Sequence, residues 1–480
     1  MAAGVHEDVA AGPIGVTMST AALPKNLHNT CVIGAGPAGL AVARALAQHG
    51  LPYTQIERHT ATGGVWDIDA PGTPMYESAH FISSRTLSGF DGFPMPNTYA
   101  DYPPHRDILA YLRAFADAYG LTERIEFGVT VKNITKLEDG SWLVERADGT
   151  ATRHDNVVSC TGAQWFPNEP EIPGTFSGEV RHTLTYRSPH EFEGKRVLVV
   201  GAGNSGCDIA CDAARSADRA VISMRRGYWF IPKHIFGQPV DVFAENGPHL
   251  PKRVEQAVFG TMLRLLMGKP ERLGLQKPDH RLFETHPVLN SMLWHHLQHG
   301  DIEARPGIKT TAGKTVTFTD GRSEDFDLIL LATGYRHLVP HGQEYFGDPQ
   351  HPDLYLSSFS REHAGLFGVG YVETNSGAYQ VFDLQAQLIA NYLAARANGA
   401  DSAARFAFLI RTERPDLSGG VKFDRSPRHR GYVDSHALTS HLRKLFTQMG
   451  WDPRATTPTG GSAAKSGRTA REQSARERVR

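Results

Sequence analysis

The chain of 480 residues is poor in cysteine and has neither a large excess of charge nor a long hydrophobic run. Its cysteines form no C-x-x-C pair, and their wide spacing argues against a disulfide scaffold or a zinc site. A reducing cytoplasm is therefore the expected location. Cys207 and Cys211 lie four residues apart on an expected helix, and we interpret them as small buried side chains rather than as a redox pair.

The balance of charge does not point to a charged macromolecular partner. Fifty Lys and Arg side chains oppose 51 Asp and Glu, a formal net charge of −1, which favours neither nucleic acid nor a membrane surface. The most apolar helical stretch, V-F-G-T-M-L-R-L-L-M-G, is short and contains Arg264, so no membrane span is predicted. The N-terminus has no basic start followed by an apolar core, and no signal peptide is expected.

The first of two glycine turns follows an apolar strand and precedes a helix. The run at residues 30–33 leads into G-A-G-P-A-G, and a helix-like segment then continues to Gly50. The glycines of such a turn permit a tight bend and let backbone N–H groups and the helix N-terminus approach a pyrophosphate. A dinucleotide is expected on Gly34, Gly36, Pro37, Ala38 and Gly39.

A second turn repeats this order. The strand R-V-L-V-V, residues 196–200, leads into G-A-G-N-S-G and a helix-like segment. With 48 glycines in 480 residues, three fixed glycines are expected by chance about half a time per chain, so the strand and helix around each turn carry the inference. The expected binding residues are Gly201, Gly203, Asn204, Ser205 and Gly206.

The residues after the next strand predict different dinucleotides for the two units. Glu57 ends the strand of the first unit, where a carboxylate can accept both hydroxyls of a ribose and would repel a 2′-phosphate, as suits FAD. In the second unit Met224 takes that place and Arg225 and Arg226 follow; their guanidinium groups can bind a 2′-phosphate, which favours NADPH over NADH. Two such sites in one chain indicate hydride transfer from NADPH to FAD.

The electron acceptor is expected to be O2, because the usual thiol pair is missing. A disulfide reductase would carry C-x-x-x-x-C soon after the first strand–helix–strand unit, and this chain has E-R-H-T-A-T-G-G-V-W instead.

The most specific motif is F-S-G-E-V-R-H-T-L-T-Y, residues 176–186. Phe176, Gly178, His182 and Tyr186 match every fixed position of F-x-G-x3-H-x3-[YF], a pattern expected by chance on the order of 0.01 times in a chain of this composition. The stretch resembles the signature of the flavin-containing monooxygenases. The related Baeyer–Villiger monooxygenases carry Trp at the last position, so Tyr186 favours the former.

Further matches extend the resemblance over residues 29–393. The G-G-V-W segment resembles the G-G-x-W flavin contact of the family, and residues 327–335, D-L-I-L-L-A-T-G-Y, resemble its ATGY region. The resemblance implies a flavin contact at Gly64, Val65 and Trp66. It also implies that His182 has a structural role at the site, holding the linker and the NADPH domain.

The resemblance implies an α/β fold with two Rossmann-like domains, in which an inserted NADPH domain splits the FAD domain. The expected boundaries are a flexible arm at 1–27, the first part of the FAD domain at 28–172, the NADPH domain at 173–327, the second part of the FAD domain at 328–454 and a disordered basic tail at 455–480.

The activity implied is NADPH- and O2-dependent oxygenation of an amine nitrogen or sulfide sulfur through a C4a-(hydro)peroxyflavin, shielded from water by bound NADP⁺. One departure keeps alternatives open. Ile82 stands where the family usually has an Asn beside the flavin, and Ser83, Ser84 or His80 would have to replace it. The alternatives are Baeyer–Villiger oxidation of a ketone, an uncoupled NADPH oxidase or flavin reductase, and a non-catalytic dinucleotide-binding regulator.

No metal is predicted, because His80, His105 and the pair His295 and His296 lack an accompanying carboxylate pattern. The expected partner is a small-molecule substrate whose identity the sequence does not give. The oligomeric state, a homodimer included, stays open.

Overall fold

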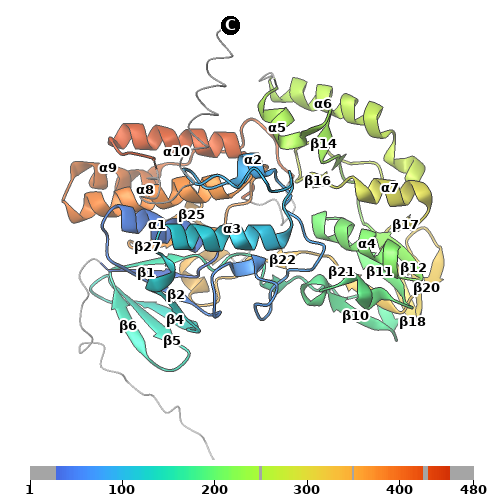
Figure 1. Cartoon of the computed structure of the whole chain (residues 1–480), viewed down its shortest axis with the longest axis horizontal. Helices are drawn as coiled ribbons and strands as arrows, with labels where there is room; N and C mark the ends of the chain where they lie inside the picture. The colour runs from blue at the N-terminus through green and yellow to red at the C-terminus, as the bar shows by residue number, and fades with distance from the viewer. Residues whose placement is uncertain (1–28, 248–250, 349–350, 425–430, 455–480) are drawn as a thin grey trace, which may run out of the picture.

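A computed structural model of the chain describes residues 29–247, 251–348, 351–424 and 431–454. They form two units side by side, each built on a parallel sheet (Figure 1). The predicted arm at 1–27 and the predicted tail at 455–480 lie outside the described residues. Within the described residues, no helix combines the length and the apolar character needed to cross a bilayer.

The first unit contains a seven-stranded sheet in the order β25-β26-β27-β7-β1-β2-β3. The strands from β27 to β3 pair in parallel, and β25 and β26 add an antiparallel edge. The central strand β1 is buried along its whole length, as expected for the apolar run T-C-V-I. The strands are β1 (Thr30–Ile33), β2 (Tyr53–Glu57), β3 (Ile125–Phe127), β7 (Asn156–Ser159), β25 (Leu354–Tyr355), β26 (Phe359–Ser360) and β27 (Leu366–Gly368).

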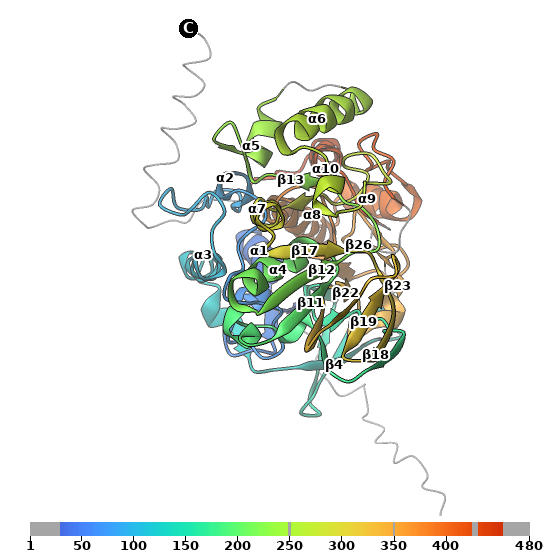
Figure 2. The same ribbon diagram turned by 90° about the vertical axis from the view of Figure 1, so that its right-hand side faces the viewer.

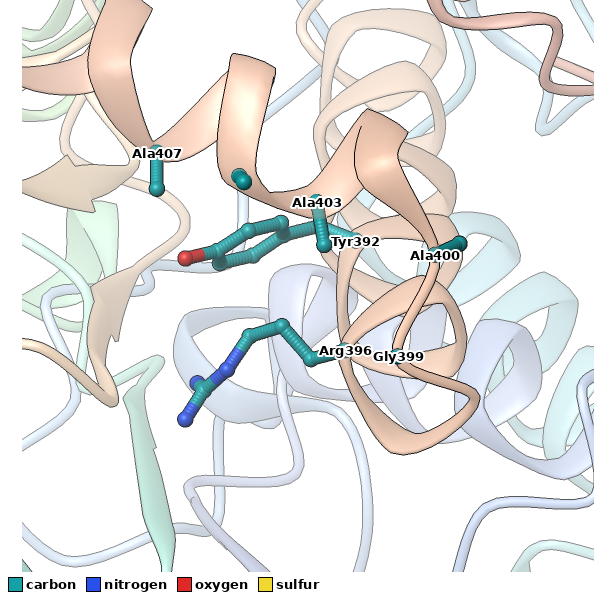
Figure 3. A pocket seen from close by; sticks show the side chains of 7 residues that line it. Tyr392, Arg396, Gly399, Ala400, Ala403 and Ala407 are labelled. Carbon is teal, nitrogen blue, oxygen red and sulfur yellow. The ribbon is translucent and has the colours of Figure 1, made fainter.

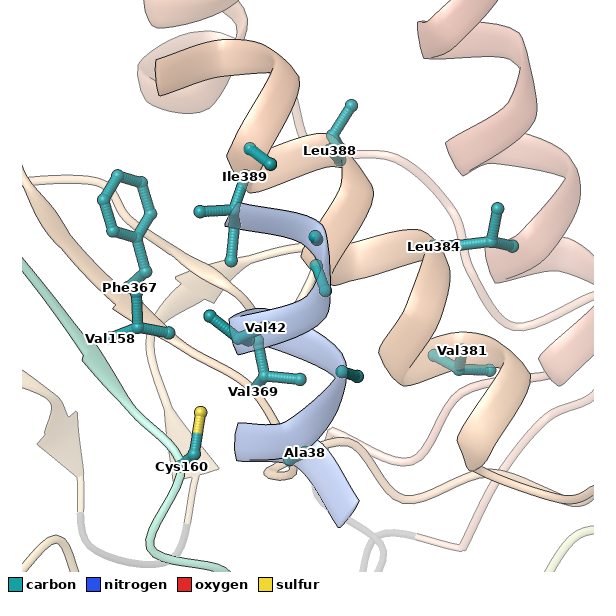
Figure 4. Packing of buried hydrophobic residues seen from close by; sticks show 14 of the residues in the cluster. Ala38, Val42, Val158, Cys160, Phe367, Val369, Val381, Leu384, Leu388 and Ile389 are labelled. Atoms are coloured by element: carbon teal, nitrogen blue, oxygen red, sulfur yellow. The ribbon is translucent and has the colours of Figure 1, made fainter. Parts of the chain in front are cut away.

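Helices α1 (Pro37–Gln48) and α8 (Tyr379–Ala397) pack together over this sheet (Figure 4). Val42 of α1, Val158 of β7, Phe367 of β27 and Ile389 of α8 belong to one buried cluster. Helix α8 is buried on nearly all sides, because α9 and α10 cover its outer faces. The other helices of this unit are α2 (Arg85–Ser88), α3 (His105–Ala118), α9 (Asp401–Thr412) and α10 (Ser435–Met449).

The second unit repeats the order of four strands of the first, with β21-β11-β12-β17 corresponding to β7-β1-β2-β3. Its five parallel strands have the order β10-β21-β11-β12-β17, with the strand before the glycine turn in the middle, as among the five parallel strands of the first sheet. Strand β10, which precedes the others in sequence, occupies the place that β27 has in the first sheet. The strands are β10 (Glu179–His182), β11 (Arg196–Val200), β12 (Arg219–Ser223), β17 (Ile302–Arg305) and β21 (Leu328–Leu331).

The two faces of the second sheet are covered differently (Figure 2). Helix α4 (Asn204–Ser216) packs on one face, where Val197, Val199 and Ile209 share a core cluster. On the other face Leu198 packs with Phe318 of an antiparallel hairpin. That hairpin belongs to a four-stranded sheet of β9 (Gly174–Phe176), β18 (Ile308–Gly313), β19 (Thr315–Phe318) and β20 (Ser323–Asp325). The first unit has a matching antiparallel sheet of β4 (Val131–Lys136), β5 (Trp142–Arg146) and β6 (Ala151–His154).

The first unit is split, since β7 and β27 are neighbours although the whole second sheet lies between them in sequence. The two crossings between the units run side by side, because β8 (Phe166–Pro167) pairs antiparallel with β22 (Tyr335–Arg336). One expected boundary is corrected: β21 hydrogen-bonds to β10 and β11, so the chain leaves the second sheet after Leu331 and not at residue 328.

An excursion from the second unit follows β12. It contains α5 (Val240–Glu245), α6 (Lys252–Met267) and α7 (Met292–His299), with the short strands β13 (Phe230–Ile231), β14 (His234–Ile235), β15 (Gln238–Pro239) and β16 (Val288–Leu289). A further small hairpin joins β23 (Gly347–Asp348) to β24 (His351–Pro352).

Candidate functional site

The first glycine turn has a geometry that only glycine allows. Gly34 has φ +110°, and a Cβ atom there would lie 2.5 Å from the carbonyl oxygen of Cys160. A Cβ atom on Gly39 would lie 2.0 Å from the oxygen of Gly34. Helix α1 begins at Pro37 with no side chain capping its first turn, so its free N–H groups can donate to phosphate oxygens. This geometry fits the pyrophosphate of a dinucleotide on the residues predicted from the sequence.

Glu57 lies at the carboxyl end of β2, beside this turn. The carboxylate is buried; one oxygen accepts the N–H of Ala35 at 2.6 Å and the other accepts the N–H of His59 at 2.9 Å. The carboxylate therefore holds the turn in shape from the position where a ribose is expected.

The G-G-V-W segment contacts the same turn. Residues Gly64–Trp66 form a single 3₁₀ turn, η2, and a Cβ atom on Gly64 would lie 2.9 Å from the Cα atom of Gly36. The carbonyl of Val65 accepts the hydroxyl of Thr73 at 2.9 Å. Trp66 continues away from the turn and packs edge-on against Phe81, with ring centroids 5.2 Å apart.

The second glycine turn has the same geometry as the first. Gly201 has φ +110°, and a Cβ atom there would lie 2.4 Å from the carbonyl oxygen of Ala332. A Cβ atom on Gly206 would lie 2.2 Å from the oxygen of Gly201. Helix α4 also begins without a side-chain cap, although the side chain of Asn204 accepts the N–H of Leu289 at 2.9 Å. Gly203 precedes the helix, and Ser205 is exposed in its first turn.

The two arginines after β12 differ in their contacts. Arg226 donates to Asp424 at 2.7 Å and to Asp279 at 3.0 Å, and these carboxylates raise its pKa although burial acts in the opposite direction. Arg225 is exposed, and no hydrogen bond or ion pair joins its guanidinium to another described residue. Of the predicted pair, Arg225 is therefore the one available to a 2′-phosphate.

Phe176 and Gly178 of the F-x-G-x3-H-x3-Y motif determine how the chain enters β10. Phe176 packs under the second sheet with the cluster that contains Phe318 and Ile329. A Cβ atom on Gly178 would lie 2.6 Å from both the ring of Phe176 and the carbonyl oxygen of Asp327. Glycine is needed here because the chain passes directly over the phenylalanine ring.

His182, the next fixed residue of the motif, ends β10 and fastens the linker between the units. Its Nδ1 accepts the N–H of Leu184 at 3.0 Å, so the proton is on Nε2, which donates to the carbonyl of Gly334 at 3.0 Å. The same carbonyl accepts the N–H of Asn168 at 2.9 Å, beside β8. Burial lowers the pKa of His182, which favours this neutral form.

Tyr186, the last residue of the motif, is fully buried. Its ring stacks on Phe192 with centroids 4.9 Å apart, and its hydroxyl donates to Asp212 of α4 at 2.9 Å. The motif is thus an edge strand and corner of the second unit, rather than only a connection between domains.

Residues 82–84, where the family usually has an Asn beside the flavin, are partly exposed. The side chain of Ile82 is 38% exposed, and Ser83 is half-buried. Ser84 is buried; its N–H donates to Asp241 of α5 at 2.6 Å, and its hydroxyl has no partner among the described residues. The described residues contain no group of three His, Cys, Asp or Glu arranged to hold a metal ion.

Sequence reasoning missed the residues of the first unit that contact α4. Tyr76 and Ser78 donate to Asp208 and Asp212, respectively. One sequence signal could have found them. Asp208 and Asp212 are four residues apart on the helix after the second turn, so they share a face of that helix, and most of the helix is buried and apolar.

A pocket of about 340 Å³ lies elsewhere, between α8 and α9 (Figure 3). Tyr392 and Arg396 line it with glycine and alanine residues, and Arg396 donates to Asn156 at the start of β7. It is therefore near the amino ends of the parallel strands, whereas the glycine turn is at the carboxyl end of β1, and we assign it no role.

A comparison with protein families matches residues 28–397 to the family described as flavin-binding monooxygenase-like. The indole-3-pyruvate monooxygenase YUCCA1 of Oryza sativa subsp. japonica is 32% identical over 327 residues, 66% of this chain and 79% of the relative. Flavin-containing monooxygenase 3 of Homo sapiens is 30% identical over 388 residues, 75% of this chain and 73% of the relative. Dimethylaniline monooxygenase [N-oxide-forming] 2 of Macaca mulatta is 33% identical over 331 residues, with 64% and 62% covered.

Solved structures resemble the fold. The S-allyl-L-cysteine S-oxygenase from Allium sativum superimposes with a TM-score of 0.61 at 22% identity, covering 90% of each chain. An epsilon-caprolactone-bound cyclohexanone monooxygenase gives a TM-score of 0.65 at 18% identity, covering 88% of this chain and 98% of that one. These likenesses support two Rossmann-type domains, as predicted.

Proposed function

Because the chain belongs to the flavin-binding monooxygenase-like family, we propose that it oxygenates a small soft nucleophile, an amine nitrogen or a sulfide sulfur. Members of the family use FAD and NADPH with O2, and the chain is an FAD-dependent monooxygenase. Family membership therefore sets aside the non-catalytic regulator considered above.

The observation that carries the choice of substrate class is Tyr186. The resemblance associates tyrosine at this position with the flavin-containing monooxygenases and tryptophan with the Baeyer–Villiger enzymes. In this chain the hydroxyl of Tyr186 donates to the buried carboxylate of Asp212, so the tyrosine makes a contact that depends on its hydroxyl. The relative from Macaca mulatta, which is named for forming N-oxides, supports the same choice.

The geometry of the two turns fits the two dinucleotides. The turn at Gly34–Gly39, with Glu57 at the ribose position and Gly64–Trp66 beside it, would hold FAD. The turn at Gly201–Gly206, with Arg225 at the 2′-phosphate position, would hold NADPH. When bound, these groups supply hydride transfer and the activation of O2.

The residues of this chain would hold the first turn and the linker between the units in place for the two dinucleotides. Glu57, which accepts two backbone N–H groups, holds the first turn in the conformation that presents its own N–H groups to phosphate. His182 keeps its proton on Nε2, bound to the linker carbonyl of Gly334, and Nδ1 is occupied by a backbone N–H. Both nitrogens are engaged, so His182 acts as a structural residue and exchanges no proton with substrate.

Ile82 supports the alternatives. An amide at this position could hydrogen-bond the flavin or an oxygenated form of it, and an isoleucine side chain has no hydrogen-bonding atom. Ketone oxygenation or uncoupled reduction of O2 to H2O2 would follow if Ser83 does not replace that amide. Ser83 is half-buried beside Ile82 and is the residue we assign to this task.

A substrate panel scored by product tests the proposal. The FAD-loaded protein is given NADPH, O2 and matched amines, sulfides and ketones, and product, NADPH loss and H2O2 are measured together. We expect N-oxide or sulfoxide in amounts close to the NADPH consumed. Esters or lactones from the ketones would establish Baeyer–Villiger oxidation instead, and H2O2 equal to NADPH with every substrate would establish an oxidase.

Two variants connect the result to the residues named. Ser83→Ala is expected to raise the H2O2 released per NADPH, since it removes the hydroxyl assigned to replace the amide. Ile82→Asn is expected to lower it. Unchanged coupling in both variants would contradict the assignment of Ser83.

A further inference from the structure

One face of helix α4 contacts residues 76–78 of the first unit. Asp208 accepts the hydroxyl of Tyr76 at 3.3 Å and the side-chain amide of Asn290 at 2.6 Å. One turn further along, Asp212 accepts the hydroxyls of Ser78 and Tyr186. The N-terminus of the same helix forms the second dinucleotide cradle, so these contacts start directly behind that cradle.

Asp212 connects the two units through a single carboxylate oxygen. Ser78 belongs to the first unit and Tyr186 to the F-x-G-x3-H-x3-Y motif of the second, and both hydroxyls donate to Oδ2. Asp212 is only 2% exposed, and the guanidinium of Arg215 is 3.9 Å from its other oxygen. Burial raises its pKa, whereas the two hydroxyls and Arg215 act in the opposite direction.

The neighbourhood of this carboxylate is closely packed. The backbone N–H of Glu77 donates to the carbonyl of Arg187 at 2.9 Å, and the rings of Tyr76 and Tyr186 lie 5.7 Å apart. Met75, Tyr76 and Ala79 belong to the core cluster of the second unit, although they come from the first. Residues 75–79 of the first unit are thus held on the second unit by hydrogen bonds and by burial.

The other end of the segment is fixed at the first cradle. Residues 64–79, which we term the bridging segment, begin where Gly64 approaches Gly36. Trp66 packs against the core clusters of both units, and the hydroxyl of Thr73 donates to the carbonyl of Val65. The bridging segment therefore runs from the first glycine turn to the helix of the second, with a close contact at each end.

We propose that Asp212 is a positioning residue that anchors the bridging segment to α4 and so sets the distance between the two dinucleotide sites for hydride transfer. The inference rests on the proposed function, because that function requires a hydride to pass from NADPH at one cradle to FAD at the other. Asp212 touches neither cradle and acts through the bridging segment. A displacement of about 1 Å between reacting groups can lower a rate on the order of a hundredfold, so the anchor has a measurable consequence.

Rapid mixing of the FAD-loaded protein with NADPH in the absence of O2 tests the proposal. For Asp212→Ala we expect the rate of flavin reduction at saturating NADPH to fall tenfold or more, with the Kd for NADPH changed less than threefold. Ser78→Ala and Tyr186→Phe, which each remove one hydroxyl, should give smaller decreases. Reduction of the flavin by dithionite should be the same in all variants.

Asp325→Asn is the matched control. Asp325 is an exposed aspartate of the second unit that accepts one hydroxyl, from Thr315 at 2.6 Å, on the antiparallel hairpin. It should leave the reduction rate unchanged. A folded Asp212→Ala protein whose reduction rate at saturating NADPH equals that of the wild type would overturn the proposal, even if its stability had fallen.

A second measurement needs no bound dinucleotide. In hydrogen–deuterium exchange of the apo-protein, the peptide containing the amide of Glu77 should exchange faster in Asp212→Ala, whereas a peptide covering β1 should not change. Unchanged exchange at Glu77 would also overturn the proposal. If the wild type were not reduced by NADPH at all, the proposed function would fail, and the exchange result would still decide whether Asp212 anchors the bridging segment.

Discussion

At the level of single residues, we expect selection of the nicotinamide dinucleotide to depend on which arginine after β12 has no carboxylate partner. Arg226 is bound to Asp279, in the excursion between β12 and β17, and to Asp424, in the segment between α9 and α10. Arg225 is exposed at the end of the strand, where a 2′-phosphate is expected. Arg226 is therefore engaged within the protein and Arg225 is available to a ligand, although the sequence alone does not distinguish these two neighbouring arginines.

Replacement of Arg225 by Ala is expected to weaken NADPH binding by about 1.5–3 kcal/mol, tenfold or more, and to leave NADH nearly unaffected, because only NADPH carries the 2′-phosphate. Arg226→Ala should alter the NADPH-to-NADH preference less and lower the unfolding temperature more. Titration of both variants with both dinucleotides, followed by flavin fluorescence, measures this. A larger change in preference for Arg226→Ala would reverse the assignment, and Arg322→Ala, on an exposed hairpin, is the control.

His182 gives a pH-dependent prediction at the same scale. Burial lowers its pKa below the ordinary 6.5, so the unfolded chain takes up a proton first as pH falls, and stability is lost below that value. The wild type should therefore exceed His182→Gln in unfolding free energy by more at pH 7.5 than at pH 5.5. Urea unfolding at the two pH values checks it; an equal difference at both would show that His182 is not held neutral. Other buried histidines are common to both proteins, so their contributions cancel.

At the level of elements, the packing of α1 on α8 includes a buried ion pair. Arg44 of α1 donates to Asp383 of α8 and to the carbonyl of Asp91, and Asp383 accepts the N–H of Asp91 at 2.6 Å. Both side chains are almost completely buried, and Phe115 of α3 lies beneath the guanidinium. The ion pair therefore joins three segments of the first unit behind the first glycine turn.

Asp383→Ala is expected to destabilise the protein by about 3–5 kcal/mol, because it leaves the buried charge of Arg44 without a partner. The double variant Arg44→Met, Asp383→Leu should lose less than this, since neither charge remains. Chemical unfolding monitored by circular dichroism gives both values. As a control, Arg322→Ala removes the exposed pair with Asp320 but keeps the bond from the backbone N–H of residue 322 to Asp320, and it should change the unfolding free energy by no more than about 0.5 kcal/mol. A double variant as unstable as the single one would mean that packing, rather than the unpaired charge, dominates.

For the whole molecule, the side-by-side crossings predict that the second unit can be removed. Pro167 of β8 pairs with Tyr335 of β22, so the two ends of the inserted unit are adjacent. Joining them with a two-residue Asn-Gly turn should leave the seven-stranded sheet intact, because all its strands lie outside the deleted residues.

The shortened protein should bind FAD and be reduced by dithionite but not by NADPH. Its unfolding temperature should fall, because Met75, Tyr76 and Ala79 lose their partners in the second unit. Flavin absorbance and anaerobic titration with the two reductants measure these properties. Failure to fold or to hold FAD would mean that the first unit depends on the second for its stability.

The elements that the sequence specified best are the ones governed by local rules. The strand at 30–33, the helix after each glycine turn and the burial of Cys207 and Cys211 follow from short-range pattern and composition. The end of the inserted unit was placed four residues too early. The run at 328–331 is apolar in either unit, and only its pairing with β10 and β11 assigns it to the second sheet.

The sequence by itself determined the two glycine turns and the resemblance to the family. A tight glycine turn needs glycines within a few positions of one another, and the chain that passes over the ring of Phe176 needs glycine at position 178. The tertiary structure alone decided which arginine is available and what Tyr186 binds. It also decided that Ser78 of the first unit donates to Asp212 of the second. These contacts link residues 26 to 198 positions apart, and no local pattern specifies a pairing over that separation.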